Sequence, residues 1–110
     1  MPRVTKEHAG PEQTDDGRYV VIDGRRRSAT DPDIPEAEAA ELRRALMAAR
    51  RAVGAALRAG DAEAERAARA RVQAAKVALG ERGTPWWEQS DAERRRRWQG
   101  FLADLRSSAG

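Results

Sequence analysis

The short break at Gly60 and Asp61 constrains the fold of this chain more than any other feature. A long segment rich in alanine, arginine and glutamate, which are good helix formers, lies on each side of it. Glycine adopts the left-handed conformation that ends many helices, and aspartate is a preferred residue at a helix N-terminus. Because the connection is so short, the two helices must run antiparallel, and the break predicts a helical hairpin.

We expect the first helix of this hairpin to span residues 35–59. Pro35 suits the first turn of a helix, and the glutamates that follow it favour the positive end of the helix dipole. Apolar residues recur at spacings of three and four and form one stripe, which predicts the packing face: Leu42, Leu46, Ala49, Val53 and Leu57.

The second helix is expected over residues 61–82. Its stripe is mostly alanine, which allows the two helices to approach closely: Ala64, Ala68, Val72, Ala75 and Leu79. Gly80 and Gly83 favour an end to the helix, and Pro85 prevents its continuation.

A third helix is predicted over residues 90–106. Ser90 and Glu93 have the spacing of a capping box, in which each side chain accepts a hydrogen bond from the other's backbone. An apolar face follows at helical spacing: Trp98, Phe101, Leu102 and Leu105. The four arginines at 94–97 point in four directions, about 100° apart, and therefore do not form one patch.

A β-hairpin is predicted over residues 17–30, after a disordered tail at 1–16. The run from Tyr19 to Ile22 is aromatic and β-branched, and Asp23-Gly24 favours a type I′ turn. An isolated two-stranded hairpin is unstable in water, so it must pack on the helices or on a partner's strand.

The expected fold class is therefore mainly α: an N-terminal β-hairpin, an antiparallel helical hairpin and a C-terminal amphipathic third helix, in one small domain over residues 17–110. Hydrophobic residues make up 40% of the 110 residues, but 23 of them are alanine. Because large apolar side chains are scarce, the helices must pack closely or take core from a second subunit.

Several runs of residues resemble a family of small bacterial proteins. They are YVVIDGRR at 19–26, TDPDIP at 30–35, MAARRAV at 47–53, AKVALGERG at 75–83 and PWW at 85–87. Members of this uncharacterised family often carry an automatic label as a Tol-type biopolymer transporter. The resemblance covers about residues 18–88, with the GERGxPWW run its most specific part, and it implies a bacterial source without a mechanism. Near Arg27, where the family commonly has an aromatic residue, this chain has arginine.

Residues that would support catalysis or metal binding are sparse. The single histidine, His8, has no partner nearby in sequence, so no serine has a base to activate it, and the chain has no cysteine. The glycines at 80 and 83 lack the phosphate-loop spacing. No apolar run is long enough to cross a bilayer. We therefore expect no catalytic, metal or cofactor site, no membrane partner, and a cytoplasmic location.

Nucleic acid is one possible partner. Arg25, Arg26 and Arg27 stand on the returning strand of the β-hairpin, and residues 17–30 hold four arginines against one aspartate. A two-stranded ribbon of this kind can enter a major groove. The competing interpretation is coding bias, because 19 of the 21 cationic residues are arginine.

Four aromatic residues are candidates for an interface or a helix junction: Tyr19, Trp86, Trp87 and Trp98. We expect one ring of the adjacent pair to fill the junction before the third helix, and leave open which one. An exposed tryptophan would favour a protein interface.

These patterns favour a non-enzymatic bacterial interaction or assembly module that self-associates as a homo-oligomer or binds a protein partner. The alternative is an accessory nucleic-acid-binding protein that uses the basic β-hairpin.

Overall fold

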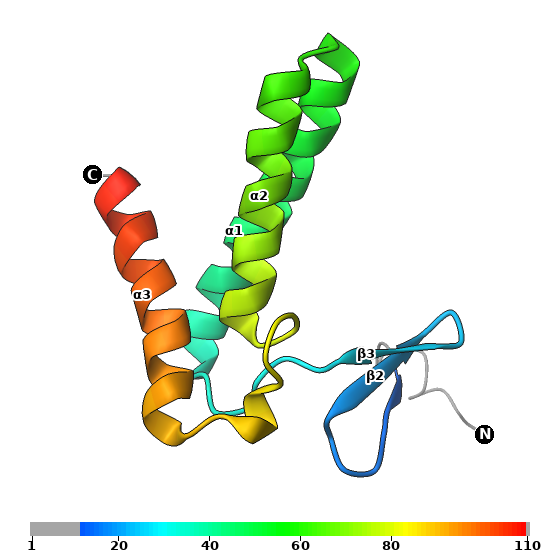
Figure 1. Cartoon of the computed structure of the whole chain (residues 1–110), viewed down its shortest axis with the longest axis vertical. Helices are drawn as coiled ribbons and strands as arrows, with labels where there is room; N and C mark the ends of the chain where they lie inside the picture. The colour runs from blue at the N-terminus through cyan, green and yellow to red at the C-terminus, as the bar shows by residue number, and fades with distance from the viewer. Residues whose placement is uncertain (1–11, 110) are drawn as a thin grey trace, which may run out of the picture.

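Two long helices, α1 (Glu36–Ala59) and α2 (Ala62–Leu79), lie side by side and antiparallel in the computed structural model of this chain, which describes residues 12–109 (Figure 1). Gly60 closes α1 in the left-handed conformation, with φ of 67°. The Asp61 carboxylate accepts a hydrogen bond of 3.0 Å from the backbone N–H of Ala64 and caps α2. The predicted helical hairpin is confirmed, with its second helix ending earlier than expected.

The hydrophobic core lies at the open end of the helical hairpin, where three leucines are almost fully buried with Trp98 of the third helix. These leucines are Leu42, Leu79 and Leu102. Along the rest of the hairpin the contact is made largely by buried alanines, among them Ala49, Ala56 and Ala68. Ala64 is exposed, so its predicted place on the packing stripe is wrong. Leu57 is 55% exposed, so its predicted place on the packing face is wrong. It lies near the tip of the hairpin, which extends well beyond the third helix (Figure 1).

Helix α3 (Asp91–Ala109) follows a short 3-10 turn, η2 (Trp86–Glu88). The predicted capping box forms: the Ser90 N–H donates to Glu93 Oε1 at 2.8 Å, and the Glu93 N–H donates to Ser90 Oγ at 3.1 Å. Trp98 and Leu102 are buried, while Phe101 and Leu105 pack partly buried against the core. An exposed ion pair between Arg106 and Glu41, at 2.7 Å, also joins α3 to α1.

The N-terminal sheet has three antiparallel strands in the order β1 (Glu12–Gln13), β2 (Tyr19–Ile22) and β3 (Arg25–Ser28). Asp23 and Gly24 join β2 to β3 with φ of 52° and 76°, the two positive values that a type I′ turn requires. The predicted mainly helical fold with a small N-terminal sheet is confirmed. In Figure 1 the sheet lies on one side of the base of the helical hairpin and α3 on the other.

Strand β1 corrects the predicted boundary of the tail, since residues 12–13 form a strand of the sheet and residues 14–16 belong to the turn that follows it. Residues 1–11 of that predicted tail lie outside the described residues. The strand pairs Glu12 with Val21 and Gln13 with Val20. The turn after it is held by Thr14, whose hydroxyl donates to Asp16 Oδ1 at 2.7 Å. This pairing gives hydrogen-bond partners to the backbone groups on the free edge of β2. The composition of residues 12–16 does not reveal it.

The segment between β3 and α1 is anchored by Asp31, the one buried charged residue among residues 12–109. Its carboxylate accepts hydrogen bonds from Arg94 Nε at 3.0 Å and Arg97 Nη2 at 2.6 Å. Its backbone N–H donates to the Leu79 carbonyl at 2.9 Å. Asp31 therefore connects the linker, the end of α2 and the first turns of α3.

The arginines at 94–97 divide between two environments. Arg94 and Arg97 are one helical turn apart and both point to Asp31, while Arg95 and Arg96 are exposed. The prediction that the four do not form one patch agrees with this arrangement. Sequence reasoning missed that two of them hold a buried carboxylate.

Of the two adjacent tryptophans, Trp86 is the buried one. Its indole Nε1–H donates to the Ala29 carbonyl at 2.9 Å and holds the end of the sheet against the helices. Trp87 is half-buried and packs edge-on against Tyr19, with ring centroids 5.3 Å apart. The sheet is therefore stabilised by its own third strand and by the tryptophan pair.

Candidate functional site

A cleft of about 920 Å³ lies between the sheet and the helices α1 and α2. Strands β2 and β3 form one wall, and one face of α1 forms the other. The end of α2 and the residues just after it close the cleft. The lining residues are Val20, Ile22, Arg26, Arg27, Ser28, Ala29, Thr30, Arg43, Leu46, Met47, Arg50, Lys76, Glu81 and Arg82.

Positive charge dominates this cationic cleft, which six cations line together with one carboxylate. That carboxylate, Glu81, accepts a hydrogen bond of 2.7 Å from the Thr30 hydroxyl. Arg43 forms an exposed ion pair with Glu36 at 3.0 Å. Within residues 12–109 the other five cations form no ion pair: Arg26, Arg27, Arg50, Lys76 and Arg82.

The pKa of Lys76 is lowered by its burial and by the positive charge of this cleft. Burial lowers the pKa of its ammonium group, and the nearby charges of Arg82, Arg50 and Arg27 lower the pKa further. Glu81 opposes the shift without cancelling it. A bound anion would relieve the repulsion among these cations, because an opposite charge favours the charged form of each. The cleft is therefore suited to an anionic ligand.

The register of the sheet places Arg25 and Arg27 of the predicted nucleic-acid contact on one face of the sheet and Arg26 on the other. Val20 is paired with Arg27 and Ile22 with Arg25, whereas Val21 is paired with Arg26. Directly opposed residues share a face of a sheet, and successive residues alternate between faces. Arg27 therefore lies beside Val20 and Ile22.

The other two arginines of the triplet have different surroundings from Arg27. The guanidinium of Arg26 lies 4.5 Å from the centre of the Tyr19 ring, and Arg26 also lines the cleft. Arg25 does not line the cleft. Two members of the predicted triplet, Arg26 and Arg27, therefore line the cleft, and the third does not.

Sequence reasoning missed the cations that the helices contribute to this site. Arg50, Lys76 and Arg82 come from α1, the last turn of α2 and the loop after it. Arg43 and Arg50 are seven residues apart, which places them on one face of α1. That spacing is visible in the sequence, but nothing in it indicates that the sheet lies over this face.

Two exposed apolar side chains also belong to the cationic cleft. Ile22 is 40% exposed and Met47 is 41% exposed. Together with Leu57 they are the exposed large hydrophobic residues among residues 12–109. Leu57 is remote at the hairpin tip, whereas Ile22 and Met47 both line the cationic cleft.

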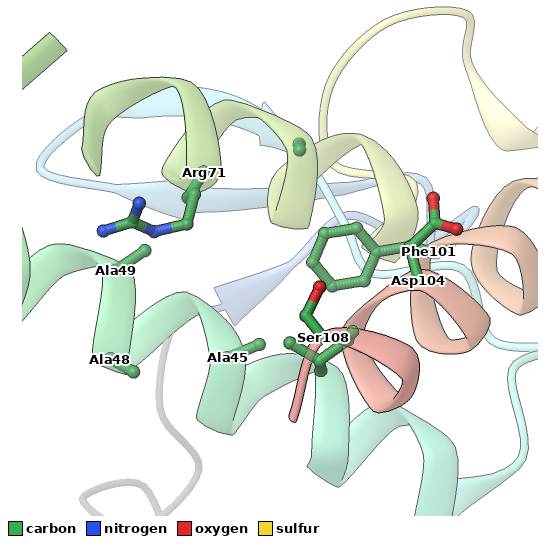
Figure 2. A pocket seen from close by; sticks show the side chains of 9 residues that line it. Ala45, Ala48, Ala49, Arg71, Phe101, Asp104 and Ser108 are labelled. Atoms are coloured by element: carbon green, nitrogen blue, oxygen red, sulfur yellow. The ribbon is translucent and has the colours of Figure 1, made fainter. Parts of the chain in front are cut away.

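A second concavity, an apolar groove of about 470 Å³, lies where α3 diverges from the helical hairpin. Figure 2 shows the Phe101 ring over α1, with Arg71 of α2 and Asp104 of α3 on opposite sides of it. The remaining lining residues are Ala45, Ala48, Ala49, Ala74, Leu105 and Ser108.

The four aromatic interface candidates each make contacts within the fold. Trp98 packs in the core, Trp86 binds the end of the sheet, and Trp87 contacts Tyr19. None of the four lines the cationic cleft or the apolar groove. They position the walls of the cleft and do not form its surface.

Residues 12–109 contain no group of three or more histidine, aspartate or glutamate side chains placed to hold a metal ion. None of their helices combines the length and the apolar character needed to cross a bilayer.

Comparison of the chain with protein-family models, with curated proteins and with solved structures finds no significant match. The resemblance to the small bacterial family therefore stays an expectation.

Proposed function

We propose that this chain is a non-enzymatic binding module whose working surface is the cationic cleft and whose partner is a nucleic acid. The observation that supports the proposal is the convergence of Arg27, Arg50, Lys76 and Arg82 from three parts of the chain: β3, α1, and the end of α2 with the loop after it. A phosphodiester backbone supplies the closely spaced negative charges that such a group of cations binds.

The proposal does not depend on the abundance of arginine. Several arginines outside the cleft have carboxylate partners: Arg69 pairs with Glu65, Arg106 with Glu41, and Arg94 and Arg97 with Asp31. Arg27, Arg50, Lys76 and Arg82 differ because they line one cleft and form no ion pair within residues 12–109. Coding bias raises the number of arginines but does not by itself gather cations around one cleft.

The chemistry of the side chains also suits phosphate. A guanidinium group can donate two parallel hydrogen bonds to phosphate oxygens, and an ammonium group binds phosphate as a point charge. Val20 and Ile22 on one wall and Leu46 and Met47 on the other give the cleft an apolar component as well. A nucleotide has both kinds of surface.

Binding of labelled oligonucleotides, followed by fluorescence anisotropy over a salt series, tests the proposal. The logarithm of the binding constant should fall linearly with the logarithm of salt concentration, by about 0.7 to 0.9 for each phosphate contacted. Arg27→Gln and Lys76→Gln should each weaken binding and make this slope shallower by about 0.7 to 0.9, the contribution of one phosphate contact. Arg58→Gln and Arg66→Gln, exposed and outside the cleft, are the controls. Absence of binding at low salt would overturn the proposal.

Self-association is a second candidate function, favoured by the apolar groove between α1, α2 and α3. Six of its nine lining residues are alanine, leucine or phenylalanine, and Arg71 and Asp104 carry opposite charges on its two sides. Two copies related by a two-fold axis can pair each charge with the other, since such interfaces are self-complementary.

Sedimentation over a range of concentrations tests this second candidate. The chain should sediment as a dimer at micromolar concentration, and Ala48→Glu in the groove should produce a monomer. Ala55→Glu, on an exposed position of α1 outside the groove, is the matched control. A compact monomer at every concentration would rule out self-association.

A further inference from the structure

The apolar residues of the cationic cleft indicate which form of nucleic acid it takes. We infer that the cleft binds a single strand, with phosphates on its cations and an unstacked base between Ile22 and Met47. This inference rests on the proposed function and goes beyond it by naming the ligand.

Each wall of the cleft pairs a cation with an exposed apolar side chain. On the sheet, Ile22 and Arg27 share one face, because Ile22 is opposite Arg25 and Arg27 lies two residues farther along β3. On α1, Met47 and Arg50 are three residues apart and so are neighbours on the helix surface. The same combination therefore faces the cleft from two elements that are remote in sequence.

A single strand has surfaces that match this combination. Its backbone is charged, and its unstacked bases expose flat apolar faces that stack on or pack against protein side chains. A duplex keeps these faces stacked inside and presents mainly phosphates and groove edges. Binding to a duplex would leave Ile22 and Met47 without an apolar partner.

The shape of the site supports the same choice. The cleft is concave, with a volume of about 920 Å³ between two walls. Its size is that of pockets that enclose ligands of drug size, roughly 300 to 1,000 Å³. A nucleotide fits within such a space, whereas the wide convex surface of a duplex would rest on the rim.

An acidic peptide with apolar side chains is the other partner that this chemistry would accommodate. The nucleic acid is favoured because cations from three parts of the chain surround a small volume, which suits the dense charge of a phosphodiester chain. The test therefore includes a peptide with alternating glutamate and leucine residues.

Four probes distinguish the outcomes when compared at one salt concentration: a single-stranded oligonucleotide without secondary structure, a duplex of equal length, inorganic polyphosphate and the acidic peptide. We expect the single strand to bind at least about tenfold more tightly than the duplex. Tighter binding of the acidic peptide than of the oligonucleotide would overturn both the inference and the nucleic-acid proposal.

Variants of the two apolar residues give the second readout. Ile22→Thr keeps a β-branched residue in the strand, and Met47→Gln keeps a good helix former, so both should fold. Each should weaken oligonucleotide binding about threefold to tenfold, because the bound base loses its contact with a half-exposed apolar side chain. The salt slope and polyphosphate binding should stay unchanged, and Leu57→Gln at the hairpin tip should have no effect.

The failures of the inference and of the proposed function are distinguishable. Equal affinity for single strand and duplex, or equal loss of polyphosphate binding in the Ile22 and Met47 variants, overturns the inference and leaves the nucleic-acid proposal standing. Absence of binding to every polyanion at low salt overturns both.

Discussion

Asp31 accepts hydrogen bonds from both Arg94 and Arg97, which lie one turn apart on α3 more than sixty residues later in the chain. The carboxylate is 1% exposed, and both guanidinium groups are largely buried. This cluster holds the linker after the sheet against α3. It also fixes the orientation of the sheet that forms one wall of the cationic cleft.

Replacing Asp31 with asparagine should destabilise the fold strongly. The substitution keeps the shape but removes the carboxylate partner of Arg97 and leaves Arg94 with the exposed Asp33 alone. Loss of one partner from a buried ion pair typically costs about 3 to 5 kcal/mol. Urea unfolding followed by tryptophan fluorescence measures the change. Asp33→Asn removes an exposed partner of Arg94 alone and should cost less than about 1 kcal/mol. Equal losses in the two variants would contradict a central role for Asp31.

Acid should weaken the fold through the same carboxylate. Burial raises the pKa of Asp31, but hydrogen bonds from Arg94 and Arg97 outweigh this effect and bring it to about 2, from 3.8 in an unstructured chain. Because the folded pKa is the lower one, the stabilisation is complete above about pH 4 and is lost as the pH falls toward 2. The loss should amount to about 2 kcal/mol. Thermal unfolding from pH 6 to 2 measures it, and Asp31→Asn should show a correspondingly flatter dependence.

Gly80→Ala should also destabilise the chain. Gly80 has φ of 84°, and an added Cβ would lie 3.0 Å from the Asp31 Cβ and 3.2 Å from the Trp86 ring. Strain in the left-handed region costs about 1 to 3 kcal/mol before the close contacts are counted. Gly54→Ala is the control, because its helical backbone accepts alanine and should be neutral or stabilising by up to about 1 kcal/mol. Denaturant midpoints of the two variants should therefore shift in opposite directions or by clearly different amounts.

Trp86→Phe should loosen the attachment of the sheet. The substitution removes the hydrogen bond from the indole Nε1–H to the Ala29 carbonyl and leaves a buried carbonyl unpaired, at a cost of about 1 to 3 kcal/mol. Amide hydrogen exchange should accelerate in β2 and β3 more than in α1. Trp87→Phe, which removes part of a half-buried ring, should change exchange less. Uniform acceleration along the chain would instead indicate global destabilisation.

The local elements of the fold could be predicted because adjacent residues specify them. Gly60 and Asp61 end one helix and begin the next through their own backbone and side chain. Ser90 and Glu93 cap α3 through contacts three residues apart. Asp23 and Gly24 close a tight turn whose dihedral angles few other residues adopt easily. In each case the interaction spans a few residues and is visible as a short motif.

Strand β1 and the exposure of Leu57 could not be predicted in the same way. Glu12 and Gln13 have little intrinsic preference for a strand and join the sheet because β2 offers a free edge. Leu57 satisfies the apolar spacing of α1, yet α3 does not extend to the hairpin tip, and within residues 12–109 the side chain stays 55% exposed. Both outcomes depend on the position of a distant neighbour.

The candidate site depends on tertiary structure even more strongly. The order of residues specifies a basic strand and arginine-rich helices, since charge and periodicity are local properties. Only the packing of the sheet over α1 brings Arg27 together with Arg50, Lys76 and Arg82, and only the register turns Arg26 toward Tyr19. The physical reason is that electrostatic interactions depend on distances in space. In this chain those distances are set by Asp31 and Trp86, whose partners lie far away in sequence.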